Sequence, residues 1–91
     1  METRVAVLGI IVESQESVEK INAILHEYAP YILGRMGIPY RKRDISVISI
    51  VLDAPQKVTS ALAGKLGMLP HVSTKTLYSN IIQDDECETI S

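Results

Sequence analysis

The chain has 91 residues, which suit one domain rather than two. Its formal net charge is −2, from nine basic and eleven acidic residues, so it lacks the basic excess of most nucleic-acid-binding domains. The single cysteine, Cys87, excludes an internal disulfide. Hydrophobic residues make up 46% of the chain, yet Phe and Trp are absent, so aliphatic side chains must form the core.

The first predicted element is a strand over residues 5–12, an apolar run rich in β-branched side chains. A helix is predicted to follow it. Ser14 is a candidate N-cap, and Glu16 lies in the first turn, where the helix dipole favours an acidic side chain. Pro30 ends this helix, along which apolar residues recur at helical spacing: Val18, Ile21, Ile24, Leu25 and Tyr28.

A hairpin is predicted in the middle of the chain. Its first strand covers residues 31–40, and Pro39 restricts that strand to a sheet edge or marks its end. Residues 41–44 form a charged turn, and residues 45–52 are the clearest strand in the sequence. Because the turn is so short, the two strands must pair in antiparallel fashion.

A second helix is predicted after Asp53, a candidate N-cap, with Pro55 in its first turn and Gly67 as its C-cap. Alternating residues over 71–78 predict the last strand. The resulting order is β-α-β-β-α-β. Right-handed crossovers convert that order into a ferredoxin-like α+β fold, in which a four-stranded antiparallel sheet carries two helices on one face.

The domain organisation follows from the absence of internal linkers and repeats. We predict one ferredoxin-like domain over residues 1–79 and an acidic, flexible C-terminal tail over residues 80–91. The first apolar run is too short to span a bilayer, and no small-residue cleavage site follows it. We therefore expect a cytoplasmic protein that does not associate with membranes.

The two strands predicted at the centre of the sheet are apolar on both faces. A sheet with helices on one side should carry polar residues on its other side. Burying about 400 Å² of apolar surface contributes about 10 kcal/mol gross, which the lost rigid-body freedom opposes. We predict a homo-oligomer, either dimer or tetramer, with a tolerated patch on a monomer as the alternative. The predicted interface residues are Val5, Val7, Ile11, Ile45, Val47 and Val51; the pattern leaves open which apolar face of the first strand takes part.

The candidate effector site is Arg35 with the neighbouring glycines Gly34 and Gly37. A charge in the middle of a strand needs a partner, such as a carboxylate of another subunit or an anionic effector. The alternative is an edge-strand charge that discourages unwanted pairing. The glycines indicate either bulges and close packing or a place where another molecule approaches the backbone.

The sequence does not indicate a metal site, an active site or a nucleic-acid contact. His26, His71 and Cys87 have no metal-ligand spacing, so no metal or other cofactor is predicted. No serine or cysteine has the context of a nucleophile, and no carboxylate pair is placed for catalysis, so we do not predict an enzyme. The basic residues 41–43 indicate a solvated hairpin tip rather than a nucleic-acid contact.

Three segments, RVAVLGIIVE, LHEYAPYILGRMGIPYRKRDISVISIVLDAP and SALAGKLGMLPHVSTKTLYS, resemble the family of iron-only hydrogenase system regulators. The resemblance covers about residues 4–79 and implies a domain similar to the C-terminal regulatory domain of the nickel-responsive repressor and to ACT domains. Those domains bind small effectors or metals between subunits and form dimers or tetramers. This sequence shows neither a ribbon-helix-helix segment ahead of its first strand nor the nickel-binding cluster, so neither direct DNA binding nor nickel sensing is expected.

The sequence thus predicts an effector-sensing regulatory module of the iron-only hydrogenase system. It would act as a homo-oligomer, with a ligand or partner at the subunit interfaces. The alternative is an interaction or scaffold protein for hydrogenase assembly that binds no small ligand. A small enzyme such as an acylphosphatase needs an arginine and an asparagine together; Asn22 and Asn80 are predicted in the first helix and the tail, which argues against it.

Overall fold

The computed structural model describes residues 2–80. Its elements follow the predicted β-α-β-β-α-β order: β1 (Arg4–Val12), α1 (Gln15–Glu27), β2 (Ile32–Tyr40), β3 (Ile45–Ala54), α2 (Gln56–Gly67) and β4 (Val72–Tyr78). Two short 3₁₀ helices, η1 (Ala29–Tyr31) and η2 (Arg41–Arg43), flank β2. The predicted tail, with Cys87, lies outside the described residues.

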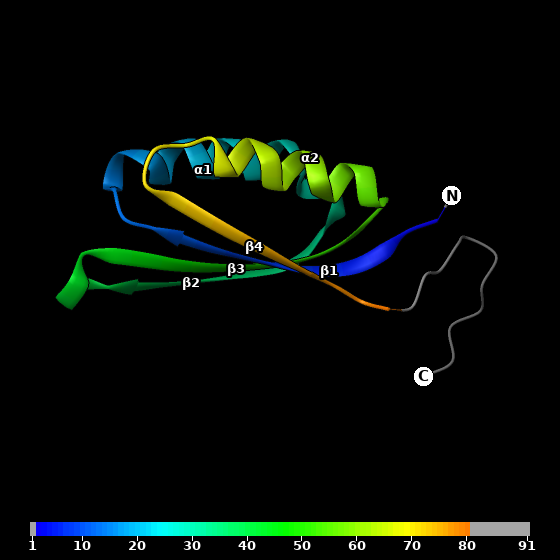
Figure 1. Ribbon diagram of the computed structural model, residues 1–91, viewed down its shortest axis with the longest axis horizontal. Coiled ribbons are helices and arrows are strands. Elements are labelled where there is room, and N and C mark those ends of the chain that lie inside the picture. The colour runs from blue at the N-terminus through cyan, green and yellow to red at the C-terminus, as the bar shows by residue number, and fades with distance from the viewer. Residues whose placement is uncertain (1, 81–91) are drawn as a thin grey trace.

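The four strands form one antiparallel sheet in the order β2-β3-β1-β4. Both helices pack on the same side of this sheet, and no described element covers its other side (Figure 1). This architecture confirms the predicted ferredoxin-like fold, and it places β1 and β3 at the centre of the sheet as expected. None of the helices in residues 2–80 is long and apolar enough to cross a membrane.

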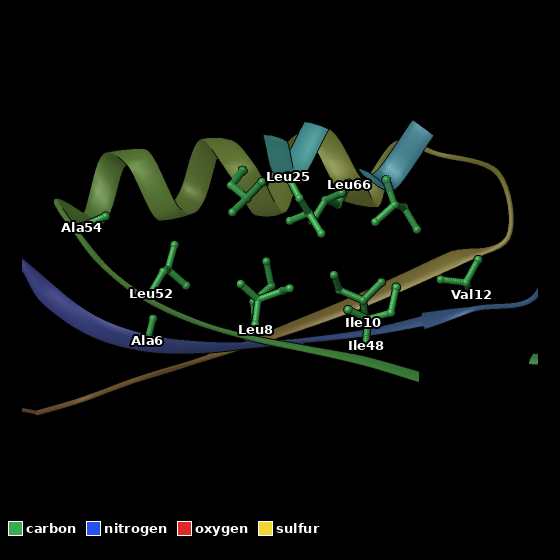
Figure 2. Packing of buried hydrophobic residues seen from close by; sticks show 12 residues of the cluster. Ala6, Leu8, Ile10, Val12, Leu25, Ile48, Leu52, Ala54 and Leu66 are labelled. Atoms are coloured by element: carbon green, nitrogen blue, oxygen red, sulfur yellow. The ribbon is translucent and has the colours of Figure 1, made fainter. Parts of the chain in front are cut away.

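The core lies between the sheet and the helices. Alternate residues of the central strands point towards α1 and α2, and Leu8, Ile50 and Leu52 are fully buried there. Ile21 and Leu25 complete the core from α1, while Leu62 and Leu66 do so from α2. Figure 2 shows these aliphatic side chains filling a single layer, so the absence of Phe and Trp does not prevent a continuous core.

The two helix starts differ from each other in how well the sequence predicts them. Ser14 is the N-cap residue of α1 as expected, although its side chain makes no capping hydrogen bond. The prediction for α2 is wrong, because Pro55 takes the N-cap position and Asp53 is still part of β3. Pairing of β3 with β1 continues as far as Ala54, which holds the Asp53 carboxylate away from the helix.

Two buried hydroxyl groups in the helices have opposite environments. The Ser17 hydroxyl of α1 donates a 2.7 Å hydrogen bond to the Pro70 carbonyl oxygen and so ties α1 to the loop before β4. Thr59 of α2 is fully buried, and its Oγ1 has no hydrogen-bond partner within residues 2–80. A buried hydroxyl without a partner lowers stability, whereas one with a partner contributes to it.

Thr59→Val is therefore expected to raise the free energy of unfolding by about 1 kcal/mol, because it removes an unsatisfied hydroxyl at nearly constant shape. Ser17→Ala is the matched control and should lower the same quantity by about 1 kcal/mol, since the Pro70 carbonyl loses its donor. Urea denaturation measures both changes. A loss of stability in Thr59→Val would contradict the assignment of this hydroxyl as unsatisfied.

Candidate functional site

The side of the sheet away from the helices, here called the open face, is dominated by apolar side chains. Eight of the eleven exposed large hydrophobic residues within residues 2–80 lie on it, with exposed fractions between 37% and 71%. They come from all four strands: Val5, Val7 and Ile11 of β1, Met36, Ile38 and Tyr40 of β2, Val47 of β3 and Leu77 of β4.

The structure places all six predicted interface residues on this open face. Val5, Val7, Ile11 and Val47 are exposed there, whereas Ile45 and Val51 are half-buried among their neighbours. The alternate residues of β1 form the buried core instead. Of the two apolar sets of β1, only the one with Val5, Val7 and Ile11 is exposed to solvent and available to a partner.

Four residues of the open face were missing from the sequence prediction, and the strand register brings them to it. In β2, Ile38 lies opposite Val47, and Tyr40 lies opposite Ile45. Met36 belongs to the same alternating series, and Leu77 of β4 lies opposite Val7. A signal was present, since residues 36, 38 and 40 are apolar with a period of two. The intervening glycine and proline made this strand look irregular.

The open face has a shallow hollow near its centre and little charge. Gly9 has no side chain to fill the hollow, whose volume is about 260 Å³ and whose lining is almost entirely apolar. Among residues of the four strands, only Asp53 and Lys75 bring charges to this face. These two charges cancel, so two copies of the face do not repel each other.

Arg35 lies on the opposite side of the sheet, the side that carries the helices. It pairs with the buried Ile50 in the ladder between β2 and β3. Its guanidinium donates a 2.9 Å hydrogen bond from Nη2 to Oδ1 of Asn22 on α1. The sequence argument had separated Asn22 from any arginine, but the packing of α1 over the sheet brings this pair together.

The three predicted effector residues do not share one surface. Gly34 lies opposite Val51 on the open face, next to an irregularity in the β2–β3 ladder. Gly37 lies opposite Ile48, on the same side as Arg35. A Cβ atom added at either glycine would meet nothing within 4 Å. Packing within the described chain therefore does not require glycine at these two positions, and their assignment to an effector site stays a prediction.

Residues 2–80 contain no group of three or more His, Cys, Asp or Glu side chains that could hold a metal ion. The basic residues of η2 are exposed at the hairpin tip.

The pKa of Lys65 on α2 lies above its ordinary value. The first cause is a hydrogen bond with the Tyr28 side chain, and the second is the negative charge of Glu27 at the end of α1, which stabilises the ammonium. This contact joins the C-terminal end of α1 to α2.

Comparison with known proteins identifies the relatives of this fold and sequence. The model of the TM1266-like family, described as the proposed regulator of the iron-only hydrogenase system, matches residues 4–76. The chain belongs to this TM1266-like family. It is also similar to the solved structure of the uncharacterized protein TM1266 from Thermotoga maritima. No curated protein matches the chain.

The similarity to TM1266 extends over almost the whole fold. The two sequences are 32% identical, and the two structures superpose with a TM-score of 0.81. The match covers 84% of this chain and 96% of the TM1266 chain. The resemblance inferred from the three sequence segments is therefore confirmed.

Proposed function

We propose that this protein is a non-enzymatic, cytoplasmic regulatory module of the iron-only hydrogenase system. It acts as a homo-oligomer and senses an effector or partner bound where subunits meet. The family description supports the link to that system. The observation that carries the proposed mode of action is the open face, because eight exposed apolar side chains on a single sheet surface are typical of an interaction site.

The size of the open face is sufficient for self-association. Strands about 4.8 Å apart that rise about 3.3 Å per residue give a four-strand face of roughly 500 Å². Two such faces bury roughly 1,000 Å² in total, which meets the lower limit for a specific interface. Burying about 400 Å² of apolar surface on each copy, about 800 Å² in total, contributes about 20 kcal/mol gross, against an association cost of about 4–15 kcal/mol or more.

A second copy of the chain is the partner that fits this surface. The face is mostly apolar, and its two strand charges, Asp53 and Lys75, have opposite signs. A two-fold axis brings the same patch of both copies together, so such a face pairs with itself without an excess of charge. An effector then regulates the assembly if it binds one state of association more tightly than the other.

Deletion of the gene in a host with an iron-only hydrogenase tests the proposal. We expect a change in hydrogenase transcript levels that the wild-type gene restores. A gene encoding the Val47→Lys variant, which adds a charge in the middle of the open face, should fail to restore it. Unchanged transcripts would overturn the regulatory proposal, and lower hydrogenase activity per molecule of hydrogenase would then favour the assembly-scaffold alternative.

A further inference from the structure

The helix-bearing side of the sheet has a groove where α1 lies beside the edge strand β2. Its volume is about 250 Å³, slightly below the roughly 300–1,000 Å³ of pockets for drug-sized ligands. Among residues 2–80, no acidic side chain lines this groove. The lining residues are Asn22, Leu25, His26, Ala29, Ile32 and Arg35.

Arg35 supplies a positively charged group that is held in place. Its hydrogen bond to Asn22 uses one of the five N–H donors of the guanidinium. Within residues 2–80 that amide is its partner, and no carboxylate pairs with it. The contact directs the guanidinium towards α1 and leaves it further N–H donors at the groove, and a guanidinium with free donors binds carboxylates well.

Two more donors lie beside this guanidinium. Oδ1 of Asn22 accepts the hydrogen bond from Arg35. The NH₂ group of the same amide therefore points in another direction, and its two N–H groups can still donate hydrogen bonds. His26 is four residues further along α1 and therefore on the same face of the helix, and it lines the same groove. Three side chains that carry nitrogen atoms thus line one groove, and no carboxylate of residues 2–80 accompanies them there.

The floor of the groove is apolar. Leu25 is almost fully buried beneath it, and Ile32 and Ala29 complete the surface. Donors at the rim above an apolar floor match a molecule with a negative group at one end and a hydrocarbon body at the other. We infer that the groove formed by Asn22, His26 and Arg35 binds a small organic carboxylate.

The groove and the open face lie on opposite sides of the sheet. Arg35 points towards α1, whereas Val47 and its neighbours point away from the helices. Binding of a carboxylate can therefore be measured separately from self-association. The inference does not rest on the proposed function, because the groove lies away from the face where subunits are proposed to meet, and carboxylate binding can be tested whether or not the chain forms oligomers.

Titration of the ¹⁵N-labelled full chain, followed by NMR at constant ionic strength, tests the inference. Sodium benzoate should cause saturable shifts of backbone amide signals around residues 22–35. Benzylamine, which has the same ring but a positive charge, should cause none. Inorganic phosphate should bind at least about tenfold more weakly than benzoate, because it gains nothing from the apolar floor.

The decisive variant is Arg35→Met, which keeps an unbranched apolar chain but removes the guanidinium. It should weaken benzoate binding at least tenfold while leaving the melting temperature and the solution mass unchanged. Arg43→Met is the matched control, since Arg43 is exposed at the hairpin tip and lines no described groove, and it should bind benzoate like the wild type. Equal binding by Arg35→Met, equal affinity for phosphate, or shifts that never saturate would each overturn the inference.

Discussion

Replacing Val47 by lysine is expected to reduce the protein in solution to single subunits of about 10 kDa. Val47 lies on the central strand β3 and is 38% exposed on the open face, between Ile11 of β1 and Ile38 of β2. In a free subunit the lysine ammonium remains in water, but in a face-to-face assembly it must be buried without a partner. An affinity loss of at least about 100-fold follows from a penalty of about 3 kcal/mol.

Light scattering over a range of protein concentrations measures this effect, and Ala61→Lys is its control. Ala61 is exposed on α2, so the same charge placed there should leave the mass at the wild-type value. If the wild-type protein is itself a single subunit at the highest accessible concentration, the open face is not an interface between copies, and the oligomeric part of the proposed function is wrong.

Leu8→Ala should cause the largest loss of folding stability among the changes considered, about 3 kcal/mol. Leu8 is fully buried at the centre of the sheet, opposite Ile50 and Thr76, and it faces the helices. Removing its side chain leaves a cavity that the surrounding elements fill only in part. A domain of this size is stable by about 5–15 kcal/mol, so the loss is a large share of the total.

Val7→Ala is the control for this experiment, because Val7 is the preceding residue and points to the open face. Its effect on a single subunit should stay below about 1 kcal/mol, since the side chain is already partly in water. Both variants should be compared in the Val47→Lys background, because association adds to apparent stability. Equal losses at the two positions would contradict the assignment of the buried and open faces of β1.

The elements of this fold are predictable because most of their signals are local. The periodicity of residues 5–12 and 45–52 indicates strands whatever the rest of the chain does. The start of α2 was not predictable in the same way. Asp53 has the chemistry of an N-cap, but the ladder with β1 extends past it, and no property of the local sequence reports where a partner strand ends.

The candidate site was predictable only in part. The apolar faces of the central strands follow from their own sequences, so Val5 and Val47 were found. Membership of Leu77 in the same surface depends on its register against Val7, and that register is set by the whole sheet. The contact between Arg35 and Asn22 joins residues 13 positions apart. It depends on the angle and position at which α1 packs over β2, and the spacing of side chains along a single element does not predict either.

Self-association through the open face, as proposed, would also link the lifetime of the chain to its abundance. Its apolar residues come from the edge strands as well as the central ones, so a freshly made subunit presents the whole surface to water at once. The proposed pairing with a second copy would stabilise the folded state by mass action and make the melting temperature rise with protein concentration. Cells that make little of this protein would therefore degrade each copy faster by proteolysis. Turnover would then set a minimum concentration of the protein below which it cannot act as a regulator.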